Sequence, residues 1–115
     1  MTITLHGIPN CDTVKKARAW LDAQGVAHEF RDYKKAPPSP EELQGWAART
    51  GWEPLLNKAG TTFRKLPDAD RTGLDESKAI ALMVANPSLI KRPVVTGADD
   101  LLVGFKPDLW SAVLG

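Results

Sequence analysis

The chain has 115 residues, enough for one domain whose apolar core needs no disulfide bonds. Its 15 basic residues nearly balance 14 acidic ones, so charge gives no reason to expect nucleic acid or an anionic membrane as a partner. A single cysteine excludes an internal disulfide and a self-contained dithiol redox cycle. With no signal-peptide pattern at the N-terminus and no apolar run of membrane-spanning length, we expect a cytoplasmic protein.

The first predicted elements form a βαβ unit. Residues 2–5 alternate between polar and apolar side chains, which predicts a strand. Apolar residues recur at helical spacing over 13–24, and Gly25 is a typical helix end. Residues 26–33 alternate again and predict a second strand. Because the joints are short, the two strands should be parallel and joined by a right-handed crossover.

Two helices are predicted in the middle of the chain. The first covers residues 39–51 and begins with a capping box, in which Ser39 is the N-cap and Glu42 its partner. The second runs from about residue 75 to 86, where an Asn-Pro pair should end it. Residues 57–65, between the helices, are polar and contain glycine, which predicts a loop.

The C-terminal part predicts a β-hairpin followed by a helix. The strands cover residues 92–96 and 101–103, and the turn covers 97–100. A last helix begins at residues 106–108. The four tryptophans are spaced as residues of helix faces that point into the core.

The order of these elements predicts the fold class. Without residues 37–90 it is βαβ–ββα, and a cysteine at the head of the first helix in that order is typical of the thioredoxin-like fold. We therefore expect an α/β protein with a mixed four-stranded sheet. The expected single domain 1–115 has a thioredoxin-like core at about 1–36 and 91–115 and a helical insertion at about 37–90.

Cys11 lies at the junction between the first predicted strand and the first predicted helix. Free backbone N–H groups and the positive end of the helix dipole meet there, and both stabilise a thiolate, so the pKa of the thiol should fall below about 8.5. A lone cysteine can also be a small buried apolar residue. The polar neighbours of Cys11 favour the reactive thiol. Asp12 would either raise the pKa of Cys11 slightly or cap the helix.

Other polar residues have more ordinary explanations. His6 and His28 are expected to be strand residues rather than ligands. Lys34 and Lys35 are expected to form a solvated turn. His, Cys, Asp and Glu residues show no metal-ligand spacing, so no metal site is predicted.

Several stretches of the chain resemble the arsenate reductase-like (ArsC/Spx) family and, more narrowly, its YffB-like branch. They are residues 7–17 (Gly-Ile-Pro-Asn-Cys-Asp-Thr-Val-Lys-Lys-Ala), 55–57, 60–66, 90–93 and 104–105. The resemblance covers essentially the whole chain and implies a thioredoxin-like fold with a catalytic cysteine. In the arsenate reductases of this family that cysteine attacks arsenate, three arginines hold the oxyanion, and glutathione and glutaredoxin complete the reduction.

The resemblance assigns roles to individual residues. Cys11 corresponds to the nucleophile, Arg64 and Arg92 to two of the arginines, and Lys106 to the third, with its charge but without the planar fork. Pro93 is expected to be cis. Without the resemblance, Arg64 would be placed in a solvated loop, and Lys106 could equally begin the last helix. The expected residues that bind substrate, glutathione or oxyanion are Asn10, Thr13, Lys15, Arg64, Arg92, Pro93 and Lys106.

The chain departs from the arsenate reductases beside the cysteine. Their Cys-Gly-Thr-Ser-Arg is Cys-Asp-Thr-Val-Lys at residues 11–15, and the histidine that they place four residues before the cysteine falls on Gly7. Spx-type regulators often carry a Cys-x-x-Cys switch, and Val14 stands at its second position here. The YffB-like branch, which resembles glutathione-dependent thiol reductases, is matched best.

The expected function is therefore a cytoplasmic glutathione-dependent thiol/disulfide reductase. Cys11 would form a mixed disulfide, and glutathione would resolve it as co-substrate because no second cysteine exists. One alternative is a glutathione- and glutaredoxin-dependent arsenate reductase. A second alternative is a non-catalytic Spx-like binding module. We expect a monomer that uses glutathione, with glutaredoxin as a further candidate partner and with no metal, nucleotide, nucleic acid or membrane.

Overall fold

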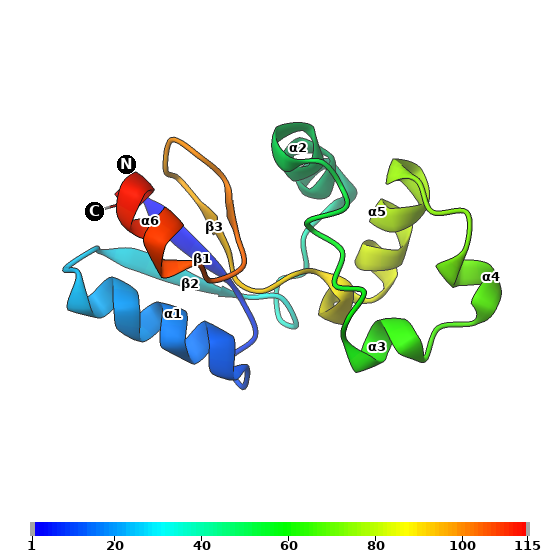
Figure 1. Ribbon diagram of the computed structural model, residues 1–115, viewed down its shortest axis with the longest axis horizontal. Coiled ribbons are helices and arrows are strands. Elements are labelled where there is room, and N and C mark those ends of the chain that lie inside the picture. Colours follow the sequence, from blue (N-terminus) through cyan, green and yellow to red (C-terminus); the bar gives the residue numbers. More distant parts are fainter. Residues whose placement is uncertain (1, 115) are drawn as a thin grey trace. The chain divides into compact units, whose positions relative to one another are not determined.

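The computed structural model describes residues 2–114. Its internal contacts divide the chain into two compact units (Figure 1). The sheet unit contains the residues up to Ala36 and those from Arg92 onward, and the helical unit is Pro37–Lys91. The sheet unit is therefore assembled from two stretches that lie far apart in the sequence.

A four-stranded sheet in the order β2-β1-β3-β4 forms the centre of the sheet unit. Strand β1 runs parallel to β2 and antiparallel to β3, and β3 runs antiparallel to β4. This is the predicted βαβ–ββα order with a mixed sheet, the thioredoxin-like arrangement. The strands are β1 (Ile3–Gly7), β2 (His28–Asp32), β3 (Val94–Thr96) and β4 (Leu102–Val103), and the helices are α1 (Asp12–Ala23) and α6 (Pro107–Leu114).

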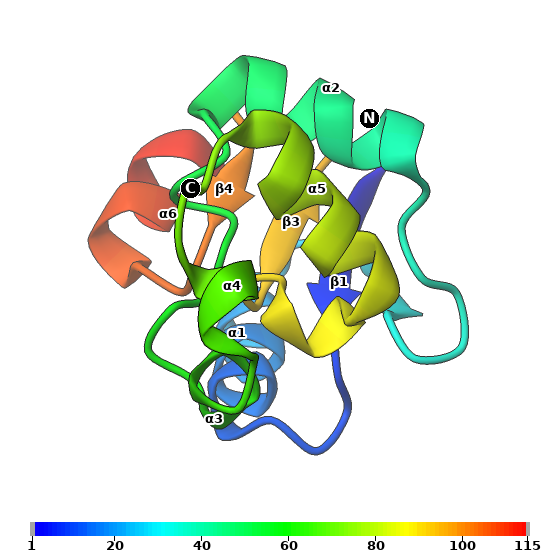
Figure 2. The ribbon, with the colours of Figure 1, turned by 90° about the vertical axis from the view of Figure 1, so that its right-hand side faces the viewer.

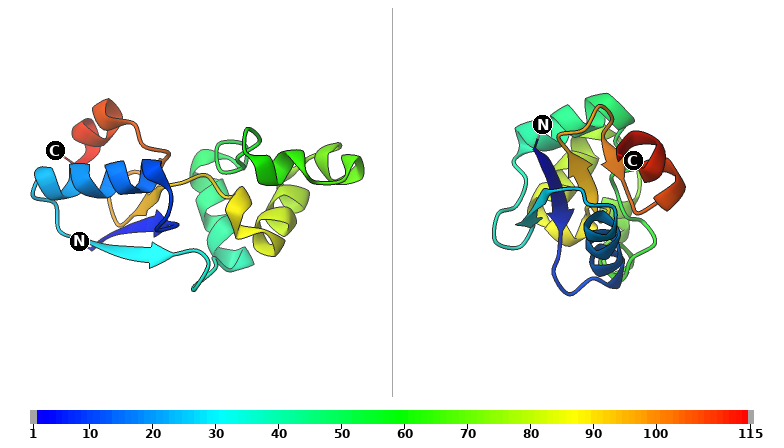
Figure 3. Two further views of the ribbon diagram at one scale, coloured as in Figure 1. Left: turned by 90° about the horizontal axis from the view of Figure 1, so that it is seen from below. Right: turned by 90° about the vertical axis from the view of Figure 1, so that its left-hand side faces the viewer.

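Helices α1 and α6 cover one face of this sheet (Figure 3). Alternation along β1 turns Ile3 and Leu5 toward that face, where they are buried. The indole of Trp110 is fully buried there, and its Nε1 donates a hydrogen bond to the carbonyl of Gly104 at 3.1 Å. The core cluster consists of Ile3, Leu5, Val14, Ala17, Leu21, Val95, Leu102 and Trp110. This packing fixes the start of α1 against the end of β1, which is where Cys11 lies.

The helical unit begins with the predicted capping box. The Glu42 amide donates to Ser39 Oγ at 3.1 Å, and the Ser39 amide donates to Glu42 Oε1 at 3.3 Å. Asp75 caps a later helix by accepting a hydrogen bond from the Lys78 amide at 2.8 Å. Helices α2 and α5 contact each other (Figure 2). The elements are α2 (Pro40–Thr50), α3 (Thr61–Arg64), α4 (Asp68–Arg71), α5 (Glu76–Ala85) and the 3₁₀ turn η1 (Pro87–Leu89).

The structure corrects the loop prediction for residues 57–65 and settles the local structure at Trp52 and Asp12. Residues 57–65 are not all loop, because α3 forms one helical turn in which the Lys65 amide bonds to the Thr61 carbonyl at 3.1 Å. A single turn has no apolar periodicity by which a sequence could show it. Trp52 is half-buried outside any helix, with the Lys58 ammonium 5.5 Å from its ring centroid. Asp12 is the first residue of α1 rather than its cap. Within residues 2–114, none of the helices has the length and apolar character to cross a membrane.

Candidate active site

Cys11 is the N-cap residue of α1. Its backbone is extended, with φ −88° and ψ 125°, and its carbonyl accepts the first helical hydrogen bond from the Lys15 amide at 3.0 Å. The Cys11 amide donates to the Ile8 carbonyl at 3.2 Å, which closes the turn between β1 and α1. The side chain is half-buried. A thiol therefore takes the position that a serine or aspartate commonly occupies at a helix start.

The pKa of the Cys11 thiol is lowered from its ordinary value. Partial burial acts in the opposite direction and is the largest single influence, because it disfavours the charged thiolate. It is outweighed by hydrogen bonds from the Val14 amide, the Arg92 side chain and the Thr13 amide, and by the positive charge of Arg92.

Strand pairing in the sheet places Arg92 next to Cys11. Strand β3 pairs with β1, and Arg92 stands just before β3, beside the end of β1 that leads into Cys11. The Arg92–Pro93 peptide bond is cis, as the family resemblance implies, and Pro93 is buried. Among the single contributions that lower the pKa of Cys11, the hydrogen bond from the Val14 amide is the largest, and Arg92 acts through both a hydrogen bond and its charge.

The other expected site residues fall into two groups. The first group lies next to Cys11 in the sequence, in the loop and the first turn of α1, and its side chains are exposed. It consists of Asn10, Thr13 and Lys15. Lys106 is exposed immediately before α6 in the sheet unit. Arg64 is exposed at the end of α3 in the helical unit, and its approach to Cys11 stays a prediction.

Gly7 and Val14 are in close contact behind the cysteine loop. A β-carbon on Gly7 would lie 2.7 Å from Val14 Cγ2, closer than such atoms approach in proteins. Val14 is fully buried. The end of β1 and the first turn of α1 are thus closely apposed, which holds the intervening loop in place. The sequence shows both residues but gives no signal that they touch.

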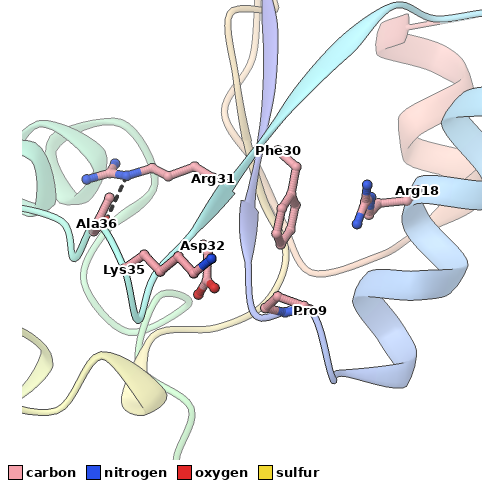
Figure 4. Close-up of a pocket in the computed structure, with 7 residues that line it drawn as sticks. All are labelled: Pro9, Arg18, Phe30, Arg31, Asp32, Lys35 and Ala36. Carbon is pink, nitrogen blue, oxygen red and sulfur yellow. Dashed lines mark hydrogen bonds between the residues drawn. The ribbon is translucent and has the colours of Figure 1, made fainter.

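A cleft that the sequence pattern does not predict lies next to the cysteine loop (Figure 4). It has a volume of about 500 Å³ and lies between α1, β2 and the turn that follows β2. The Arg18 guanidinium stacks 4.5 Å from the centroid of the Phe30 ring at this cleft. The signal in the sequence is Lys34-Lys35, for which we predict a solvated turn. The lining residues are Pro9, Arg18, Phe30, Arg31, Asp32, Lys35 and Ala36.

These features define the class of protein. The sheet order, together with a thiol of lowered pKa at the head of the first helix beside an arginine and a cis-proline, makes this a thioredoxin-like protein. Across residues 2–114, no three His, Cys, Asp or Glu side chains gather as a metal site would require.

A sequence model of the ArsC family matches residues 6–113, and the chain belongs to that family. A solved structure of a YffB protein is similar at 54% identity and a TM-score of 0.94, covering 98% of this chain and 99% of that one. The solution structure of an arsenate reductase (ArsC) related protein from Brucella melitensis is 49% identical with a TM-score of 0.78, covering 97% of this chain and 93% of that one. The global transcriptional regulator Spx of Streptococcus mutans is 33% identical over 92% of this chain and 78% of the regulator.

Proposed function

We propose that this protein is a glutathione-dependent monothiol reductase whose nucleophile is Cys11. The observation that carries the proposal is the lowered pKa of Cys11 despite its partial burial, which leaves a larger fraction of the thiol ionised at neutral pH. An ordinary thiol with a pKa of about 8.5 is only a few per cent thiolate at pH 7. The Val14 amide and Arg92 would raise the ionised fraction of the Cys11 thiol and hold the thiolate in place to attack a substrate sulfur.

The reaction balances with glutathione as the source of electrons. The Cys11 thiolate attacks one sulfur of a disulfide R–S–S–R′, forms Cys11–S–S–R and releases R′–S⁻, which takes up a proton. A glutathione thiolate attacks the Cys11 sulfur, releases R–S⁻ and leaves Cys11 joined to glutathione. A second glutathione attacks the glutathione sulfur of that mixed disulfide and frees the Cys11 thiolate. One disulfide is reduced to two thiols, and two glutathione molecules become oxidised glutathione.

The proposal is tested by intact mass and turnover. Incubation with oxidised glutathione should add one glutathionyl group to the wild type and none to Cys11→Ser. Disulfide-dependent NADPH consumption with glutathione and glutathione reductase should require Cys11. Single glutathionylation without turnover would contradict a reductase while leaving the thiol reactive. An unmodified wild type would overturn the proposal altogether.

Arsenate reduction is a second candidate, because solved relatives carry the name arsenate reductase and Arg92 would also suit an oxyanion. The same assay with arsenate as the oxidant separates the two activities. We expect the disulfide activity to be larger, since Gly7 and Val14 replace the polar pair that the arsenate reductases carry.

A regulatory binding module is the third candidate, favoured by the similarity to the regulator Spx. A module of that kind would keep its function in cells as Cys11→Ser and would return a stoichiometric partner in a pull-down. A reductase would lose its function with that substitution.

A further inference from the structure

The cleft beside the cysteine loop carries an uncompensated positive charge. Its wall includes Arg18, Arg31 and Lys35 against a single carboxylate, Asp32. Neither Arg18 nor Lys35 forms an ion pair with a carboxylate among the described residues. Arg31 is oriented away from the others, because its Nε donates to the Ala36 carbonyl at 2.9 Å (Figure 4). Two cations are therefore available to an anionic ligand.

The cleft also offers apolar surface and an open strand edge. Figure 4 shows Phe30 and Pro9 between Arg18 on one side and Asp32 with Lys35 on the other. Strand β2 is at the edge of the sheet. The Tyr33 amide bonds to the Gly7 carbonyl of β1 at 2.8 Å, and inward and outward groups alternate along a strand. The N–H and C=O of Phe30 therefore face the open edge, where the amide groups of a peptide can bond.

The cleft is within reach of the nucleophile. Pro9 lines it and is separated from Cys11 by one residue. Two Cα–Cα steps span at most about 7.6 Å, whereas a disulfide separates the Cα atoms that it joins by about 5.5–6 Å and the next residue of the tripeptide extends roughly 3.5 Å further. A tripeptide joined to Cys11 through its own sulfur can therefore lie in the cleft. The volume of about 500 Å³ is that of an ordinary site for a small ligand.

We infer that this cleft holds the glutathionyl group of the Cys11 mixed disulfide. Glutathione carries two carboxylates and one ammonium group, which match Arg18, Lys35 and Asp32 in sign and number. The inference rests on the proposed function and adds the site where its co-substrate binds. The bond is formed when the Cys11 thiolate attacks oxidised glutathione, breaks its disulfide and releases one glutathione thiolate.

The test compares two disulfides that differ in charge. The rate of reaction of Cys11 with oxidised glutathione is divided by its rate with neutral bis(2-hydroxyethyl) disulfide, in the full chain. Arg18→Gln and Lys35→Gln should each lower this ratio about two- to fivefold, as expected for losing one exposed charge pair, and together they should lower it further. Lys16→Gln is the matched control, since it removes an exposed charge from the same helix outside the cleft. Its ratio should equal that of the wild type.

A second arm needs no variant. Oxidised glutathione with its carboxylates esterified should react with the wild type more slowly, relative to the neutral disulfide, than free oxidised glutathione does. The inference is overturned if the ratio is the same in Arg18→Gln, Lys35→Gln and wild type, or if Lys16→Gln lowers it equally. A wild type that reacts with neither disulfide would instead overturn the proposed function, so the two failures are distinguishable.

Discussion

Gly7 and Val14 fit together only because Gly7 has no side chain: a β-carbon there would lie 2.7 Å from Val14 Cγ2. The two residues flank the Cys11 loop, one at the end of β1 and the other in the first turn of α1. They are also the positions where the arsenate reductases place histidine and serine. This chain has an apolar contact there instead, and its tightness fixes the Val14 amide that acts on the thiol.

Replacing Gly7 with alanine should lower the free energy of unfolding by about 1–3 kcal/mol, the usual effect of overpacking. The backbone of Gly7 does not have a positive φ, so the loss comes from the contact alone. Val14→Ala removes the opposing methyl groups. Chemical denaturation should show that the double variant is more stable than the sum of the single effects predicts. Effects that add to within about 0.5 kcal/mol would show that the two sites are independent.

The pH dependence of alkylation reports the pKa of Cys11. With iodoacetamide, the midpoint for the wild type should lie below about 8.5, the ordinary thiol value. Arg92→Ala should move the midpoint upward because it removes both a hydrogen bond and a positive charge from the thiolate. Lys106→Ala is the comparison, and its midpoint should move less. Equal midpoints in wild type and Arg92→Ala would contradict the role given to the arginine.

Stability should depend on pH through the same thiol. A folded-state pKa below the unfolded one means that the unfolded chain binds more protons between the two values, so stability rises with pH in that interval. The free energy of unfolding of the wild type, measured against Cys11→Ser, should therefore increase from the lowered pKa up to about 8.5 and then level off. As pH falls through the folded-state pKa, this contribution is lost. A difference that is constant with pH would mean that folding does not perturb the thiol.

Two glycines with positive φ should respond very differently to alanine. Gly97 has φ +94°, and a β-carbon there would lie 1.8 Å from the Thr2 carbonyl oxygen. Gly25 has φ +69°, with no described atom within 4 Å of such a carbon. Gly25→Ala should cost only backbone strain, about 1–2 kcal/mol. Gly97→Ala adds a backbone clash and should cost clearly more in thermal unfolding. Similar losses at the two sites would show that the chain near Thr2 moves aside.

Much of the fold could be predicted because its signals are local. The capping box of Ser39 and Glu42, the stop at Gly51 and the cap at Asp75 each depend on residues a few positions apart. The sheet order follows from a βαβ unit and a hairpin, whose connections are short. The helical turn α3 could not be predicted, because a single turn shows no periodic pattern in the sequence.

The candidate site was only partly predictable, because most of it depends on contacts between residues far apart in the sequence. Cys11 at the head of a helix can be recognised from neighbouring residues. The approach of Arg92 to Cys11 depends on β3 pairing with β1, a long-range contact that follows only once the thioredoxin-like fold is assumed. The cleft that joins Arg18 to Lys35 depends on how α1 and β2 are packed. Spacing along the chain carries no information on that packing.

The division of the sheet unit into two distant stretches has a consequence for biosynthesis. A ribosome releases β1, α1 and β2 first, then the whole helical unit, and only afterwards Arg92 and β3. At roughly 5–20 residues per second, the gap lasts several seconds. During that interval β1 has no partner on its β3 side and Cys11 lacks the Arg92 guanidinium. The nascent chain therefore carries its thiol early and receives Arg92 late, so the full lowering of the thiol pKa requires the residues from Arg92 onward.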